Sequence, residues 1–215
     1  MNKKRIDRCD LNGLASKFEV ISEIEKYKGQ AYYYYPNGTF CGQFGDSPEV
    51  RILNDYSDVN NLLYNSDPNS INNQGSLFSQ SNNTAAKTAI ISCFLPSSYQ
   101  GSIGTTVSQP GAAAQVSSGD FSYDPSHGSF NNYYNLQNVM VHETEHINQH
   151  QGGSTSPTQQ REVAAITTAT NHSSYVNTTD SYKTSLATQL WSNAQSLGYS
   201  KEWVSQVTGV PVSKF

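Results

Sequence analysis

The spacing of apolar positions in the first quarter of the chain predicts a helix followed by strands. Between residues 11 and 24, apolar side chains recur at every third or fourth position behind a capping Asp10, which is typical of an amphipathic helix. Two aromatic-rich runs, residues 30–35 and 39–44, flank a Pro-Asn-Gly turn signal and predict a β-hairpin. Residues 49–53 predict a third strand.

The next part of the chain is mostly polar and predicts few regular elements. Residues 54–83 are dominated by Asn, Ser and Asp and predict a loop with at most one small helix. This loop is the expected boundary between an N-terminal module, residues 1–54, and a second domain, residues 84–215, unless the two form one continuous domain. The apolar run 89–95 fits either a buried strand or a helix, because periodicity alone does not separate the two.

Helices dominate the predicted C-terminal half. Short strands are expected near residues 112–116 and 121–123, in a stretch rich in Gly, Ser and Pro. Four helices are expected beyond them, over residues 136–151, 157–169, 180–197 and 200–207. Ser156 is the expected cap of the second helix, with Pro157 at its first helical position and Gln159 completing a capping box. The predicted fold class is α+β, with a helix-and-hairpin module followed by a mainly helical half.

Composition changes the expected surface more than the expected core. Hydrophobic residues make up 35% and charged residues 14% of the chain, so the surface should be polar but weakly charged. A net charge of -4 argues against a nucleic-acid partner, because phosphate binding relies on clustered Lys and Arg. The basic group between Lys3 and Arg8 is interpreted as a solvated terminus. No run approaches the roughly 20 apolar residues of a membrane helix, and no signal-peptide core follows the basic start, so we expect a soluble chain.

The cysteines do not predict a metal site. Cys9, Cys41 and Cys93 lie far apart and show no CxxC spacing. They allow one disulfide and one free thiol.

One pentapeptide in the first of the four C-terminal helices carries recognisable chemistry. His142-Glu143-Thr144-Glu145-His146 is an HExxH pattern. Four helical positions advance about 400°, so both imidazoles stand on one face a single turn apart, as two nitrogens must to hold one zinc ion. Glu143 follows the first ligand and reaches a zinc-bound water without coordinating the metal, which is the position of a general base.

A catalytic zinc site needs a third protein ligand and one open position, and the sequence offers two candidates. His150 lies on the same helix, but about 12 Å of helical rise separates it from His142, so one ion is not easily reached from both. Glu162 lies in the second turn of the next helix, and a reversal at Gly152-Gly153 would bring it beside the first helix. We therefore expect Glu162 to be the third ligand and His150 to be a solvated residue at the helix end.

The HExxH pattern followed by a glutamate in Arg161-Glu162-Val163-Ala164-Ala165 resembles the gluzincin branch of the zincin metallopeptidases. The resemblance covers about residues 135–169 and implies a zincin-like fold. It also implies one Zn²⁺ held by His142, His146 and Glu162, with Glu143 as general base and proton shuttle. The 16 residues from His146 to Glu162 (162 − 146) are fewer than in many gluzincins.

Two further segments resemble parts of bacterial polymorphic toxins. Residues 33–46 with 50–52 look like hairpin segments that precede toxin domains in such proteins, and residues 171–175 look like part of their metallopeptidase domains. This resemblance implies a secreted or antagonistic effector, delivered by a dedicated secretion system. A peptide or protein substrate and a neighbouring immunity protein would be its partners.

The ligand set predicts hydrolysis of a peptide bond by a zinc-activated water, with Glu143 accepting the proton and returning it to the leaving amine. The oxyanion also needs a second electrophile, and His172, Tyr175, Tyr133 and Tyr134 are the candidates by position. Two other interpretations stay open. One is a zinc amidase acting on cell-wall or other non-protein amides, and the other is an inactive zincin-like binding module.

Overall fold

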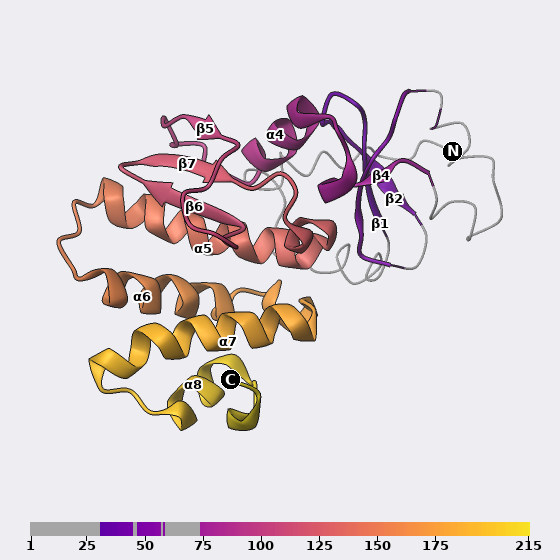
Figure 1. The fold of residues 1–215 in the computed structure, drawn as a ribbon. Helices are drawn as coiled ribbons and strands as arrows, with labels where there is room; N and C mark the ends of the chain where they lie inside the picture. Colours follow the sequence, from indigo (N-terminus) through magenta and orange to yellow (C-terminus); the bar gives the residue numbers. More distant parts are fainter. Residues whose placement is uncertain (1–30, 45–46, 57, 59–73) are drawn as a thin grey trace, which may run out of the picture. The chain divides into compact units, whose positions relative to one another are not determined.

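The computed structural model describes residues 31–44, 47–56, 58 and 74–215 (Figure 1). The helix predicted over residues 11–24 lies outside them, as does most of the predicted loop. The chain divides into two compact units. Unit 1 contains the described residues up to Leu95 together with Pro125–Tyr133, and unit 2 contains Pro96–Asp124 and Tyr134–Phe215. The predicted α+β class is confirmed, since the described residues form two small sheets and a mainly helical C-terminal half.

A four-stranded sheet forms the centre of unit 1. Its strands are β1 (Ala31–Tyr34), β2 (Phe40–Phe44), β3 (Val50–Ile52) and β4 (Ser76–Leu77), and they lie in the order β2-β1-β3-β4. The predicted hairpin is confirmed as the antiparallel pair β1–β2, and the third predicted strand, β3, pairs with β1 in parallel. All four residues of β1 are buried, as expected for a central strand covered on both faces.

Helix α4 (Thr84–Ser92) packs against the turn of this hairpin. Gly38 has φ +82°, and a Cβ atom there would lie 2.5 Å from the Cβ of Ala89 and 2.7 Å from the carbonyl oxygen of Ala86. The apolar run at 89–95 is therefore the end of a helix and the residues after it, not a strand. That helix begins earlier than the run because the side chain of Asn83 accepts a hydrogen bond from the amide of Ala86 and caps it.

A smaller sheet belongs to unit 2. Strands β6 (Ala114–Ser117) and β7 (Asp120–Tyr123) form an antiparallel hairpin, as the sequence predicts, and β5 (Ile103–Gly104) pairs with β7 in parallel. The two turn residues, Ser118 and Gly119, both have positive φ angles, 54° and 87°. This is the arrangement that two-residue hairpin turns require. The two residues of β5 are too few to give a strand pattern in the sequence.

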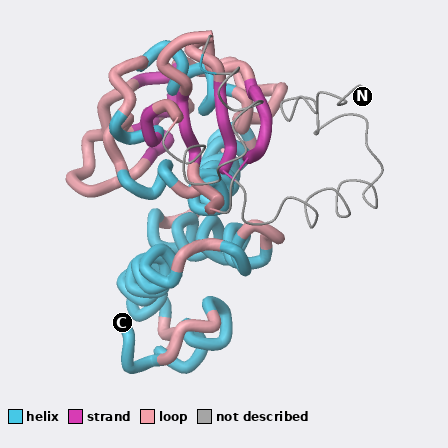
Figure 2. The backbone as a smooth tube through the Cα atoms, turned by 90° about the vertical axis from the view of Figure 1, so that its right-hand side faces the viewer, coloured by secondary structure: helices cyan, strands magenta, loops and turns pink. Residues whose placement is uncertain are grey.

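Four α-helices make up most of unit 2, and all four are predicted by the sequence. They are α5 (Tyr133–Gln151, its first residue assigned to unit 1), α6 (Thr158–Asn171), α7 (Asp180–Ala194) and α8 (Lys201–Thr208). Figure 1 shows α6 and α7 running side by side, with α8 following α7, and Figure 2 shows that most of the tube leading to the C-terminus is helical.

The expected capping box at the start of α6 is wrong. The N-cap is Pro157, with φ −53° and ψ 149°, and no side chain caps the helix. Because the extended backbone of Pro157 delays the helix by one residue, Ser156 lies outside the cap position and Gln159 is not at the third helical position.

The apolar faces of α6, α7 and α8 meet in one hydrophobic core. Its buried members are Val163, Ile166, Tyr175, Leu186, Ala187, Leu190, Ala194, Val204 and Val210. Trp203 and Trp191 pack against this core while staying partly exposed. The core packs against α6 through Val163 and Ile166, which lie directly after Glu162 and one turn beyond it.

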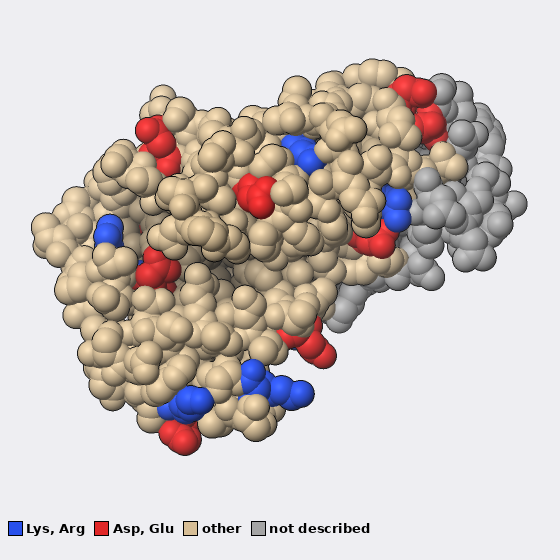
Figure 3. Space-filling model, in the orientation of Figure 1, with Lys and Arg blue, Asp and Glu red and all other residues tan. Residues whose placement is uncertain are grey.

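Three features of the structure bear on the expectations from composition. On the face shown in Figure 3, charged side chains are few and scattered among uncharged residues. None of the described helices combines the length and apolar character needed to cross a membrane. Cys93 is disulfide-bonded, in line with the single bridge that the cysteine count allows.

Candidate metal centre

Helices α5 and α6 are joined by a reversal that brings their facing sides together. α5 ends in a Schellman motif, in which the amide of Ser154 donates to the carbonyl of Gln149 (2.9 Å) and the amide of Gly153 donates to that of His150 (3.0 Å). Gly153 has φ +65°, the left-handed conformation that this motif requires. The reversal places Glu162, on the second turn of α6, opposite the histidines of α5.

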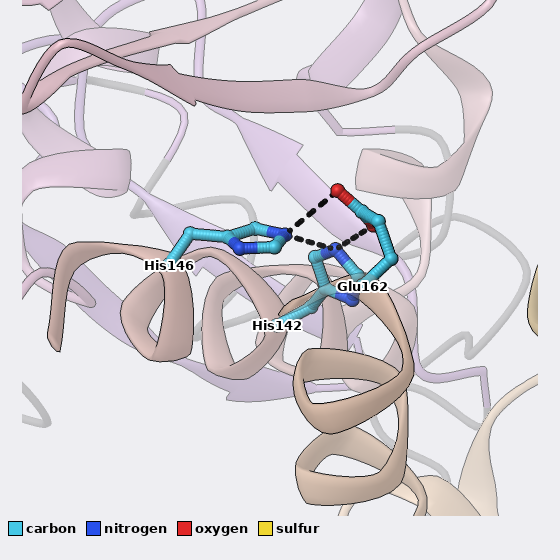
Figure 4. A group of neighbouring side chains, drawn as sticks. All are labelled: His142, His146 and Glu162. Carbon is cyan, nitrogen blue, oxygen red and sulfur yellow. Dashed lines mark hydrogen bonds and ion pairs between the residues drawn. The ribbon is translucent and has the colours of Figure 1, made fainter. Parts of the chain in front are cut away.

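Three side chains from the two helices converge at this point (Figure 4). The Nε2 atoms of His142 and His146 lie 3.1 Å apart. One carboxylate oxygen of Glu162 lies 3.3 Å from Nε2 of His146, and the other lies 3.6 Å from Nε2 of His142. Donor atoms at about 2.0–2.1 Å from a tetrahedral zinc ion are themselves about 3.3 Å apart. The three observed separations are close to that spacing, with a different oxygen of Glu162 facing each histidine. His142, His146 and Glu162 could therefore hold one metal ion.

The chemistry of the donor atoms also fits a cation. A carboxylate and two neutral imidazole nitrogens each present a lone pair, and three lone pairs at such short range repel unless a proton or a metal ion lies among them. The side chains of His142 and His146 are largely buried, at 10% and 14% exposed, and Glu162 is 26% exposed. The group is therefore largely shielded from water, and Glu162 is its most exposed member.

Mutual attraction among these groups shifts their pKa values. Burial by itself would lower the pKa of His146, but the carboxylates of Glu162 and Glu143 outweigh it and raise that pKa above its ordinary value. Burial opposes ionisation of Glu162, yet the two histidines hold the pKa of its carboxyl group far below its usual range. The ionised carboxylate of Glu162 thus faces a histidine whose protonated form it stabilises.

Glu143 lies beside the three converging residues without joining them. Its carboxylate is buried, and its Oε1 atom is 3.9 Å from Nε2 of His142. The Oε2 atom has no hydrogen-bond partner among the described residues. Burial is the main cause that raises the pKa of this carboxyl group, because removal from water disfavours the charged form. A carboxylate with raised basicity and an unused oxygen is suited to accept a proton.

His150, the other candidate for the third ligand, lies elsewhere. It is not part of the converging group formed by the described residues. Its ring lies against the turn of the β6–β7 hairpin, where a Cβ atom on Gly119 would come within 2.7 Å of Nε2. The preference for Glu162 over His150 agrees with this placement, although the ligand set itself stays a prediction.

The four candidate oxyanion donors have different surroundings. Tyr175 donates its hydroxyl hydrogen bond to the carbonyl of Thr208 (2.7 Å) inside the hydrophobic core. Tyr133 belongs to unit 1, where its ring stacks on Tyr32 with centroids 3.5 Å apart. Both rings are therefore engaged in packing.

The other two candidates, Tyr134 and His172, belong to unit 2. Tyr134 is buried. His172 is half-buried, and its Nδ1 atom lies 2.9 Å from the hydroxyl of Ser174. Burial lowers the pKa of His172. None of these four side chains makes a contact that assigns it the oxyanion role, and that role stays open.

A buried polar network, which the sequence analysis missed, lies one turn before the first histidine. Asn138 is fully buried on α5 and donates from Nδ2 to the carbonyl of Ala169 (2.8 Å) and to the hydroxyl of Ser174 (3.0 Å). Its Oδ1 atom accepts a hydrogen bond from the hydroxyl of Tyr182 (3.2 Å). Spacing gave a signal, since Asn138 and His142 are four positions apart and share a face of the helix.

Gln149 is a second residue that the sequence analysis missed. Its Oε1 atom lies 3.0 Å from Nδ1 of His146. The two residues are three positions apart, so helical spacing alone places their side chains side by side.

Comparison with known protein families gives one match. Residues 114–210 match the model of a family described as metallopeptidase toxin 2. The matched stretch contains His142, Glu143, His146 and Glu162 and supports a metallopeptidase toxin domain in this part of the chain. Such a domain implies a metal. Neither the curated proteins nor the solved structures gave a match.

Proposed function

We propose that unit 2 carries a zinc-dependent metallopeptidase of the gluzincin type, which acts as a bacterial antagonistic effector. In this proposal His142, His146 and Glu162 hold Zn²⁺, and Glu143 is the general base. The observation that carries the proposal is the convergence of two imidazoles and a carboxylate near zinc-ligand spacing, with a second, buried carboxylate, that of Glu143, beside them. The match to the metallopeptidase toxin family covers the same residues.

In the proposed mechanism Glu143 first accepts a proton and then donates it. Zn²⁺ held by His142, His146 and Glu162 would supply a Lewis acid to polarise the scissile carbonyl and to lower the pKa of a water molecule. The Glu143 carboxylate takes a proton from that water as the water oxygen attacks the carbonyl carbon. The same carboxyl group then donates the proton to the leaving amine nitrogen, so that one peptide bond is broken and one water molecule is consumed. Burial of Glu143 supports the first of these steps, because it raises the affinity of the carboxylate for the proton.

Zinc content and turnover together test this proposal. The purified protein should contain about one zinc per chain and cleave members of a peptide library. Glu143→Gln should keep the zinc and lose turnover by several orders of magnitude, because it removes the base but no ligand. Glu202→Gln is the matched control, since Glu202 lies exposed on α8 outside the centre. A wild-type protein that takes up no zinc would overturn the proposal, and loss of zinc from the Glu143 variant would reverse the assigned roles.

Growth of a bacterial host tests the effector role. Expression of the wild-type protein in the compartment that holds its substrate should stop growth, and Glu143→Gln should be tolerated. An immunity protein that covers the zinc centre should restore growth. Equal growth with both versions in cytoplasm and periplasm would contradict the toxin role while leaving the peptidase role standing.

The same assays separate the two other interpretations. Hydrolysis of cell-wall amides without cleavage of any peptide would favour the zinc amidase. Stable zinc binding without turnover of either substrate class would favour the inactive binding module. Glu143 argues against the second of these, because a purely structural zinc site needs no general base.

A further inference from the structure

Gln149 contacts both helices of the metal centre at once. On its own helix, α5, its Oε1 atom lies 3.0 Å from Nδ1 of His146, and its Nε2 atom lies 3.3 Å from a carboxylate oxygen of Glu145. Across to α6, the same Nε2 atom lies 3.1 Å from the carbonyl oxygen of Arg161, the residue immediately before Glu162. Among the described residues, no other side chain lies within hydrogen-bond distance of one candidate ligand and also of a backbone atom adjacent to a second candidate ligand.

The partners of Gln149 determine which way its amide points. A carboxylate and a backbone carbonyl only accept hydrogen bonds, so the Nε2 group must face Glu145 and Arg161. The amide oxygen is then the atom that faces His146, and it can only accept. The Nδ1 atom of His146 must therefore carry a hydrogen.

This protonation of Nδ1 prepares His146 for a metal. In a neutral imidazole, a hydrogen on Nδ1 leaves the lone pair on Nε2. Nε2 is the atom that faces His142 and Glu162. The other histidine lacks such support, because Nδ1 of His142 is buried without a hydrogen-bond partner among the described residues.

We propose that Gln149 is a positioning residue of the metal centre. It fixes the Nδ1–H tautomer of His146 and, through the carbonyl of Arg161, sets the distance between that histidine and Glu162. The inference rests on the proposed function, since it takes these residues as metal ligands. Partners of ligating histidines typically change metal affinity by 10–100-fold when they are removed.

The tautomer is measured first, in the metal-free wild-type protein. Nitrogen-15 NMR of labelled histidine side chains distinguishes a protonated from an unprotonated ring nitrogen. We expect His146 to carry its hydrogen on Nδ1 at a pH where the ring is neutral. A hydrogen on Nε2 would overturn the inference. This measurement needs neither bound zinc nor a folded variant, so it tests the tautomer of His146 even if the proposed function fails.

Zinc affinity of two variants is measured next, by competition with a chromophoric chelator. Gln149→Leu removes the hydrogen bonds to His146, Glu145 and Arg161 and should weaken zinc binding by about 10–100-fold. Gln149→Glu restores an acceptor for His146 but not a donor for Arg161, so it should recover part of the loss. The control is Asn148→Leu, the same kind of change at the exposed neighbouring position, and it should bind zinc within two-fold of wild type.

The outcomes separate this inference from the proposed function. A wild-type protein that binds no zinc refutes the function, and the NMR result then stands alone. Zinc binding by Gln149→Leu within two-fold of a zinc-binding wild type refutes the role of Gln149 and leaves the function standing. Equal losses in Gln149→Leu and Gln149→Glu refute the tautomer role. Circular dichroism of each metal-free variant checks that the helices remain.

Discussion

Removal of the Asn138 side chain should destabilise unit 2 more than any change on its surface. Asn138→Ala deletes three hydrogen bonds, to Ala169, Ser174 and Tyr182, at a fully buried position. A buried hydrogen bond contributes about 1 kcal/mol on balance, so we expect a loss of about 3 kcal/mol in the free energy of unfolding. Two of the former partners limit the damage. The carbonyl of Ala169 still accepts a hydrogen bond from the amide of His172, and the hydroxyl of Ser174 still has the ring of that histidine as a hydrogen-bond partner.

Denaturant unfolding of the metal-free protein measures this loss, followed by circular dichroism at a helical wavelength. Tyr182→Phe removes only one of the three bonds and should cost about 1 kcal/mol. Asn193→Ala is the matched control, because that asparagine is only partly buried and its side chain donates to a carbonyl of its own helix, so its loss should stay within about 0.5 kcal/mol. A loss below about 1 kcal/mol in Asn138→Ala would refute the reasoning. The three hydrogen bonds of Asn138 would then stabilise the folded protein little more than hydrogen bonds to water stabilise the unfolded chain.

Three further outcomes are expected. Glu162→Ala should weaken zinc binding by orders of magnitude and His150→Ala by no more than a few-fold, as measured by chelator competition, and the opposite ranking would overturn the gluzincin assignment. Zinc affinity should fall as the pH falls from about 8 to 6, because the metal must displace the proton of His146, whose raised pKa starts this competition above the ordinary value of 6.5; affinity independent of pH would contradict that shift. Gly38→Ala should cost about 2–4 kcal/mol in denaturant unfolding, since it combines positive φ with a clash against α4, whereas Gly198→Ala, at a similar φ in open space, should cost about 1 kcal/mol; equal costs would mean that α4 yields to the added methyl group.

The elements that the sequence predicted correctly are those whose signal is local. The helices α5 to α8 follow the spacing of their apolar residues, and the β1–β2 hairpin follows its turn residues. Residues 89–95 stayed ambiguous because a short apolar run fits a helix or a strand equally well, and the cap at Asn83 decided the matter. The capping box at Ser156 failed because its pattern leaves the backbone conformation of Pro157 open.

The proposed ligands were also within reach of local reasoning, but their supporting residues were not. HExxH places two imidazoles on one face of a helix by spacing alone, and the Gly-Gly break indicates the reversal that leads to Glu162. The position of Asn138 on α5 indicates the side on which it lies but not its partners, which come from α6, α7 and the segment between them. Such contacts depend on how the helices pack, and the residue pattern of a single sequence does not predict that packing.

The reversal between α5 and α6 has a consequence for which insertions and deletions the chain tolerates. Residues 152–157 join the helices as an exposed loop, so a residue gained or lost there is absorbed by the backbone. A residue inserted between the start of α6 and Glu162 instead rotates the carboxylate by about 100° around the helix axis, away from the histidines. Related chains that keep this centre should therefore vary in the length of the loop and preserve the count of residues from the first turn of α6 to the glutamate.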